Sequence, residues 1–252
     1  ATRRVAPTHQ FLIQSSKPFE FVKKHIKPLR DKNRDNSLRT KWWLHGRPRP
    51  ELHSSLVGKE RCVVTPEVSK HRVFIWINTN TIPDHQVRVF ARDDDYFLGV
   101  LHSKIHELWS RATGTQLREA ESGFRYTPSS TFETFPFPWA PGREPQTDPR
   151  VEAIAQAARE LVEQRERWLA PQQTSEVSQP DSLNGKAARQ TSEVSKTRRT
   201  LTALYNQRPT WLALAHEKLD RAVFAAYGWP SDLSDEDILA RLLSLNLERS
   251  AK

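Results

Sequence analysis

The sequence predicts an α+β fold: a mixed α/β domain over residues 1–140, a linker over residues 141–150, and a small helical bundle over residues 151–252. Three observations support this prediction. Short runs rich in β-branched and aromatic residues lie within residues 61–91, as expected for strands. A helical spacing of apolar residues begins at Leu101. Beyond a stretch rich in proline and glycine, apolar residues again recur at helical intervals.

The first domain is predicted to begin with irregular, basic sequence and one short helix. Residues 19–26 have helical spacing, and we expect this helix to end near Pro28, because proline disfavours helix at the residue before it. An acidic turn, Asp93–Asp95, follows the last of three strands. The predicted strands cover residues 61–65, 71–78 and 86–91.

A helix and an extended segment complete this domain. The apolar face of the helix is formed by Leu101, Ile105, Leu108 and Trp109. Residues 127–138 are predicted to be extended, because Pro136 and Pro138 disfavour helix there. The large aromatic residues predicted to lie in the core are Trp76, Trp109, Phe132 and Phe135.

Three helices are predicted in the C-terminal part. The first covers residues 151–169. Residues 171–200 are polar and contain Gln-Thr-Ser-Glu-Val-Ser twice, which favours a disordered insertion. The second helix starts near Pro209 and ends at Gly228, a typical left-handed cap. Ser234 caps the third, and the acidic residues after it suit the positive end of a helix.

The charge of the chain is concentrated in its first part. The 252 residues include 39 Lys and Arg and 30 Asp and Glu, a net charge of +9. Residues 1–150 hold 25 of the basic and 16 of the acidic residues, so the whole excess lies there. Such a field attracts polyanions, nucleic acid first and an anionic membrane surface second. A basic surface without a nucleic-acid role is the alternative that charge alone leaves open.

Composition excludes several classes of protein. A mean hydropathy of −0.71 and the lack of any apolar run of about 18 residues exclude a membrane-spanning protein. The first residues are not followed by the apolar segment of a secretory signal. The single cysteine, Cys62, excludes a disulfide framework and a multi-cysteine zinc site. Because the chain contains no methionine, we expect a processed chain or a piece of a longer one.

No complete catalytic site is recognisable. His102 and His106 have a spacing that can hold a metal, but a third ligand at a defined spacing is missing. We therefore expect these histidines to bond backbone or phosphate groups. Asp93–Asp95 lacks the acid-x-Lys element of metal nucleases and is interpreted as a turn, and neither Gly-x-Ser-x-Gly nor a P-loop occurs. The sequence thus predicts no catalytic, cofactor-binding or metal-binding residue.

Basic residues interleaved with aromatic and small polar residues favour binding to nucleic acid. Lys and Arg neutralise phosphates and release counterions, and hydroxyl groups fix register. Residues 116–125 mix Arg with Glu, which can read guanine and cytosine in the major groove. An ordinary solvated loop is the alternative for this segment. The residues predicted to contact phosphates are Lys41, Arg47, Lys70, Arg72, Ser103 and Lys104.

Three blocks of this sequence resemble the C-terminal region of MmeI-like single-chain restriction–modification enzymes (type IIL) and their methyltransferase relatives. The first block is Ser69–Phe74. The second comprises Phe97–Trp109, Arg125–Thr127 and Phe132–Pro138. The third comprises Arg208–Leu212, Ala215–His216, Leu219–Asp220, Ala225–Pro230 and Leu245–Arg249. Together they cover nearly the whole chain except residues 171–200.

The resemblance implies a DNA target-recognition domain followed by a helical segment. In the family this region follows an adenine-N6 methyltransferase that uses S-adenosylmethionine and flips its target base. Double-stranded DNA and an upstream methyltransferase domain or chain are the implied partners, in the bacterial cytoplasm and without a membrane. The family's base-reading stretch corresponds to residues 118–124. The candidate base-reading residues are Arg118, Glu119, Glu121 and Arg125.

This sequence lacks the family's Asn-Pro-Pro-Tyr/Phe catalytic motif, its Gly-rich cofactor motif and its nuclease motif. We therefore expect that the chain alone neither methylates nor cuts DNA, and that S-adenosylmethionine binds the methyltransferase domain. Two alternatives stay open. The chain completes a methyltransferase whose catalytic part lies on a preceding segment or separate chain, or it is a basic docking module that does not read sequence.

Overall fold

The computed structural model describes residues 16–44, 46, 49–81, 83–116, 123–170 and 199–251. The chain divides into two compact units, Ala1–Val57 and Gly58–Lys252, which are treated separately below. The predicted insertion at residues 171–200 lies almost wholly outside the described residues. None of the described helices is long and apolar enough to cross a membrane.

The first unit consists of short helices with no buried side chain among its described residues. The first helix ends at His25, near Pro28 as predicted, and Pro28 itself lies in the first turn of the next helix, where its missing N–H costs nothing. Phe19, Trp42 and Trp43 form a small aromatic cluster, with ring centroids 5.9 and 5.7 Å apart. The helices are α2 (Ser16–His25), α3 (Lys27–Asp31), α4 (Asn36–Thr40) and α5 (Pro50–Leu56).

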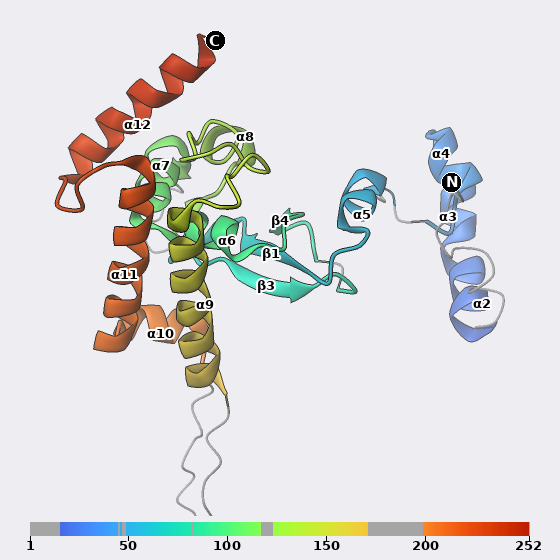
Figure 1. The fold of residues 1–252 in the computed structure, drawn as a ribbon. Coiled ribbons are helices and arrows are strands. Elements are labelled where there is room, and N and C mark those ends of the chain that lie inside the picture. The colour runs from blue at the N-terminus through green and yellow to red at the C-terminus, as the bar shows by residue number, and fades with distance from the viewer. Residues whose placement is uncertain are drawn as a thin grey trace, which may run out of the picture. The chain divides into compact units, whose positions relative to one another are not determined.

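The second unit contains two small antiparallel sheets, and Figure 1 shows the strands of the first one side by side. The first has the order β3-β1-β4, and its buried central strand supplies Cys62, Val63 and Val64 to the core. The second has the order β2-β6-β5 and was not predicted, because each of its strands has only two residues. The strands are β1 (Arg61–Pro66), β2 (Val68–Ser69), β3 (Ile75–Asn78), β4 (Val87–Phe90), β5 (Thr115–Gln116) and β6 (Phe124–Arg125).

Two consecutive helices, α6 (Asp95–His102) and α7 (Lys104–Thr113), replace the single helix that apolar spacing predicted. Asp94 caps α6 by accepting the Phe97 N–H, so the acidic run is a helix start. A short helix, α8 (Pro128–Thr131), lies inside the segment predicted to be extended. Trp109 and Phe135 are buried and Trp76 and Phe132 pack against the core, so all four predicted core aromatics are confirmed.

The four remaining helices pack onto this sheet domain rather than forming a separate bundle. The long helix α9 lies between α6 and α11 (Figure 1). At the α6 contact a Cβ on Gly99 would lie 2.7 Å from the Ile154 side chain, so the two helices approach closely. The C-terminal helices are α9 (Pro149–Leu169), α10 (Leu201–Gln207), α11 (Thr210–Tyr227) and α12 (Asp235–Ser250).

The segment predicted to be a linker, residues 141–150, is instead part of the packed structure. Glu144 is buried, accepts the Gly142 N–H and pairs with Arg92 at 2.9 Å. Asp148 caps α9 by accepting the Arg150 N–H. The division between compact units therefore falls at residue 57 and not at residue 140, because α9 shares a core with the sheets.

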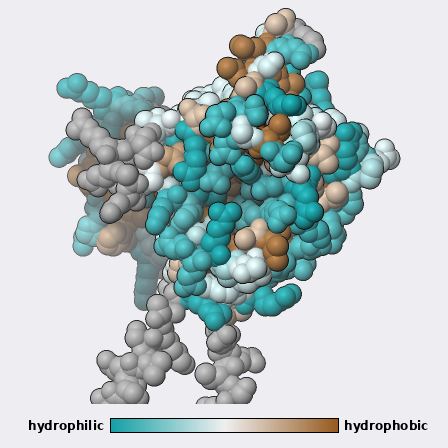
Figure 2. Space-filling model, turned by 90° about the vertical axis from the view of Figure 1, so that its left-hand side faces the viewer, coloured by the Kyte–Doolittle hydropathy of each residue, from teal (hydrophilic) through white to brown (hydrophobic). Residues whose placement is uncertain are grey.

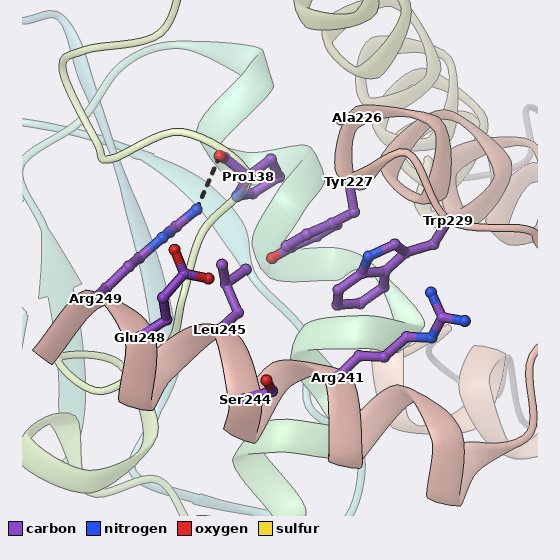
Figure 3. A pocket seen from close by; sticks show the side chains of 9 residues that line it. All are labelled: Pro138, Ala226, Tyr227, Trp229, Arg241, Ser244, Leu245, Glu248 and Arg249. Carbon is purple, nitrogen blue, oxygen red and sulfur yellow. Dashed lines mark hydrogen bonds between the residues drawn. The ribbon is translucent and has the colours of Figure 1, made fainter. Parts of the chain in front are cut away.

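The C-terminal helices also bind the proline-rich segment near residues 134–138. Tyr227 donates to the Pro136 carbonyl at 2.9 Å, and Asn246 donates to the Thr134 carbonyl at 2.5 Å. Arg249 donates to the Pro138 carbonyl across the edge of a cavity of about 300 Å³, where Tyr227 and Trp229 stack (Figure 3). The second and third sequence blocks thus meet in space.

The surface of α12 that faces away from this core carries two exposed leucines, Leu243 and Leu247. They are separated by one helical turn, and Figure 2 shows apolar side chains gathered at the top of the molecule, where α12 lies. Most of the remaining face seen in Figure 2 is hydrophilic.

Candidate nucleic-acid interface

The segment predicted to read bases is the connection between β5 and β6. Residues 117–122 lie outside the described residues, so Arg118, Glu119 and Glu121 do as well. Gly123 ends this connection with φ +80°, and a Cβ there would lie 2.2 Å from the Ser69 carbonyl oxygen. Only glycine can bring the chain so close to β2. Gly123, where the connection joins β6, therefore packs directly against the backbone of β2.

Arg125 follows two residues later on β6 and points outward. It lies opposite Val68 and Thr115 in the ladder, while the neighbouring Phe124 is buried. The arginine side chain is half exposed, and its Nε lies 3.2 Å from Glu67 Oε1. Of the four predicted base-reading residues, Arg125 is the one within the described residues, and it is accessible.

Three of the predicted phosphate contacts are accessible lysines. Lys70 and Lys41 are exposed, and Lys41 belongs to the first compact unit. Lys104 is partly exposed, but its Nζ pairs with Asp235 at 2.6 Å, while its backbone N–H donates to Asp220. A phosphate would have to compete with Asp235 for Lys104. Arg47 lies outside the described residues.

Arg72 has a structural position in place of the phosphate contact predicted for it. Its guanidinium is buried and donates to Thr65 Oγ1, to the Pro66 carbonyl and to the Phe124 carbonyl. It also lies over the rings of Phe124 and Tyr126, at 4.7 and 5.0 Å from their centroids. Burial lowers the pKa of Arg72 to about 10, so it stays charged at neutral pH. The buried Arg72 side chain thus links the first sheet, through Thr65, to the second sheet, through Phe124.

Ser103 is likewise structural. Its side chain is fully buried, donates to the Val100 carbonyl at 2.7 Å and accepts the His106 N–H as the N-cap of α7. A hydroxyl enclosed in this way cannot reach a phosphate. We therefore leave Ser103 and Arg72 out of the DNA-contacting set.

The two histidines bond backbone groups, one of the two roles expected for them. His106 Nδ1 donates to the Leu101 carbonyl at 2.8 Å, and Nε2 accepts from the Tyr126 hydroxyl at 3.1 Å. His102 Nε2 lies 2.6 Å from the Phe74 carbonyl oxygen. Burial lowers the pKa of His106 to about 3 and that of His102 well below its usual value, so both are neutral. The described part of the chain has no His, Cys, Asp or Glu group suited to a metal.

Sequence reasoning missed Glu67 and Arg88, which lie beside Arg125. Glu67 stands directly after β1, and its carboxylate pairs with Arg88 at 2.7 Å as well as with Arg125. The available signal in the sequence was an acidic residue, Glu67, among basic residues at the end of a predicted strand. It was not decisive, because the partner from β6 is 58 positions further along the chain and only the second sheet brings it close.

Residues 15–139 match the family model described as MmeI, target recognition domain. This part of the chain is an MmeI-type target recognition domain. The resemblance seen in the sequence is thereby confirmed, and the matched range ends one residue before the predicted boundary at residue 140. The matched range contains both small sheets and helices α2 to α8.

Two longer proteins are similar to the chain that contains this target recognition domain. DNA methyltransferase A of Bacillus subtilis (strain 168) is 28% identical over 196 residues, which are 75% of this chain and 18% of the relative. A solved structure of the type IIL restriction–modification enzyme MmeI in complex with DNA matches 93% of this chain with a TM-score of 0.63 and 19% identity. That match supports the α+β fold and covers 27% of the MmeI chain. The chain thus spans well under a third of each.

Proposed function

We propose that this chain reads a specific base sequence in double-stranded DNA, as the recognition part of a bacterial restriction–modification enzyme with an adenine-N6 methyltransferase. The observation that carries the proposal is the match of residues 15–139 to the MmeI target recognition domain. The geometry agrees with it, since the connection leads from the edge strand β5 to the central strand β6 of the second sheet, where the Arg125 side chain is exposed.

Base reading and phosphate binding are assigned to different residues. Base reading is assigned to Arg118, Glu119, Glu121 and Arg125, because Arg and Glu side chains can discriminate base edges in the major groove. Phosphate contacts are assigned to Lys41, Arg47, Lys70 and Lys104, which act on any sequence.

Catalysis is assigned to a methyltransferase domain or chain that works with this one. The sequence contains no Asn-Pro-Pro-Tyr/Phe motif and no Gly-rich cofactor motif, so S-adenosylmethionine is expected to bind that partner. The relatives in which this region occurs are several times longer, which agrees with such a division of labour. Copurification of methyltransferase activity with this chain in its native enzyme tests the assignment.

The primary test is selection of bound duplexes from a randomised DNA pool, followed by sequencing. Substituting Arg118→Ala is expected to relax the selected motif at one base pair, at a cost of about 1–3 kcal/mol there. Other positions of the motif should be unchanged, because each reading side chain contacts its own base. A uniform loss of affinity for all sequences would contradict base reading by Arg118. Selection of no motif by the unaltered chain would instead favour a basic docking module.

Neutralising exposed lysines is expected to change salt dependence without changing the motif. Each of Lys41→Gln and Lys70→Gln should reduce the slope of log affinity against log salt by about 0.9 if it removes one phosphate contact. The matched control is Lys218→Gln, an exposed lysine that pairs with Glu160 between two C-terminal helices. Titrations of one selected duplex at several salt concentrations measure the slopes. An unchanged slope in the Lys41 and Lys70 variants would remove these lysines from the interface.

A further inference from the structure

Glu67 lies where the chain passes from the first sheet of the target recognition domain to the second. It stands between the end of β1 and the start of β2. Its backbone N–H donates to the Gln86 carbonyl at 2.6 Å, and its carbonyl accepts the Tyr126 N–H at 2.7 Å. Both bonds join segments that are distant in sequence. The backbone of Glu67 is therefore held in place independently of its side chain.

The Glu67 carboxylate lies between two guanidinium groups from different sheets. Oε2 is 2.7 Å from Arg88 Nη2 on β4, and Oε1 is 3.2 Å from Arg125 Nε on β6. The exposed fractions of the Glu67, Arg88 and Arg125 side chains are 19%, 32% and 50%. Exposure thus rises toward Arg125, which is the outermost member of the three.

The contact with Glu67 uses the Nε side of Arg125. Nη1 and Nη2 at the end of the guanidinium then form the pair of donors that matches O6 and N7 of guanine. A free arginine side chain loses considerable rotamer entropy when it is fixed in one position. Fixing it in advance lowers the cost of binding.

The charges of Glu67, Arg88 and Arg125 also argue that Glu67 is more than one half of an ordinary surface ion pair. A carboxylate near DNA is repelled by phosphates, so an acid at this surface weakens binding unless it serves another group. Here two cations share one anion, and the trio keeps a net positive charge. The Arg125 side chain is half exposed, and an ion pair at such a surface position adds little to stability, about 0–1 kcal/mol, so stability alone is a weak reason for the arrangement.

We propose that Glu67 is a positioning residue, which holds Arg125 so that its terminal amino groups read one guanine of the DNA target. The proposal rests on the proposed function, since it deepens the base-reading role assigned to Arg125 on β6. It adds the residue that orients the arginine and the base that the arginine selects.

Pool selection and binding to single-base variants of the selected duplex test the proposal with the full chain. Arg125→Ala should abolish the preference for guanine at one position, reducing the guanine-to-other ratio by about 5- to 150-fold. Glu67→Gln should reduce the ratio at that same position by a smaller factor. The double variant should lose no more than Arg125→Ala alone, because Glu67 acts through Arg125. Glu67→Asp, which restores the charge, should recover part of the preference.

The matched control is Glu152→Gln, since Glu152 is an exposed glutamate that pairs with Arg159 on α9. It should leave every position of the motif unchanged. Urea unfolding of each variant confirms that the fold is retained, and a role of Glu67 only in stability would alter unfolding and not base preference. A guanine preference that persists in Arg125→Ala, or a Glu67→Gln variant that weakens all sequences equally, overturns the inference. Failure of the unaltered chain to select any motif would instead contradict the proposed function.

Discussion

Lowering the pH from about 7.5 to about 5 is expected to reduce the free energy of unfolding of the second compact unit by about 3 kcal/mol or more. The cause is three histidines that are kept neutral by burial. Burial lowers the pKa of His106 to about 3, that of His216 to about 4, and that of His102 well below the ordinary value of 6.5. As the pH falls, these three histidines are therefore protonated in the unfolded chain at a higher pH than in the folded chain. The stabilisation is present above pH 6.5 and is lost as the pH falls toward the folded pKa values.

The magnitude follows from the size of the shifts. Between pH 6.5 and about 5, His106 and His216 each lose about 2 kcal/mol, at about 1.4 kcal/mol per pH unit. His102 adds to this loss. Asp220 opposes it, because burial raises its pKa to about 6 and the folded state takes up that proton first, a gain of about 1 kcal/mol.

Urea denaturation of the full chain at the two pH values measures this effect. We expect a clearly lower midpoint at the acid pH. His216→Gln, which can still bond the Tyr205 hydroxyl, should remove about 2 kcal/mol of the pH dependence. The control is His85→Gln, because the His85 side chain is 83% exposed and its substitution should change nothing. Equal midpoints at both pH values would show that the buried histidines do not govern stability.

Arg72→Lys is expected to destabilise the second unit by roughly 3 kcal/mol, at about 1 kcal/mol for each of the three hydrogen bonds that its guanidinium donates. The acceptors are Thr65 Oγ1 and the carbonyls of Pro66 and Phe124. A lysine ammonium is a compact point charge and cannot reproduce the planar fork or its stacking on aromatic rings. Urea unfolding at neutral pH measures the loss.

The alternative is that Arg72 contacts a phosphate, as the sequence alone predicted. This alternative predicts a change in the salt dependence of DNA binding and no change in stability. A phosphate contact would leave stability unchanged in Arg72→Lys and lower the salt slope in Arg72→Gln. Lys70→Gln is the matched comparison, since Lys70 lies two residues away and is exposed. It should retain full stability and lose salt dependence. A variant of Arg72 with normal stability and a reduced salt slope would return Arg72 to the interface.

The longer helices and the first sheet could be predicted because their signals are local. The three strands of the first sheet lie within a few residues of their predicted positions. Gly228, at φ +70°, ends α11, and Ser234 caps α12 by accepting the Asp237 N–H, both as expected. A cap depends only on residues within one turn, so sequence contains enough information to place it. The two-residue strands of the second sheet carry no such signal, because pairing across long distances creates them.

The sequence by itself determined the fold class, the longer helices, the first sheet, the basic first part and the resemblance to MmeI-like enzymes, since periodicity, capping and motifs are properties of neighbouring residues. Only the tertiary structure decided which polar residues face solvent. The sequence predicted the same role for Arg72 and Ser103 as for their neighbours Lys70, which is exposed, and Lys104, which is partly exposed, yet Arg72 and Ser103 are buried and bonded within the core. Burial and partners depend on segments far apart along the chain. For the same reason only the structure brings Glu67 to Arg125 and joins α9 to the sheet domain.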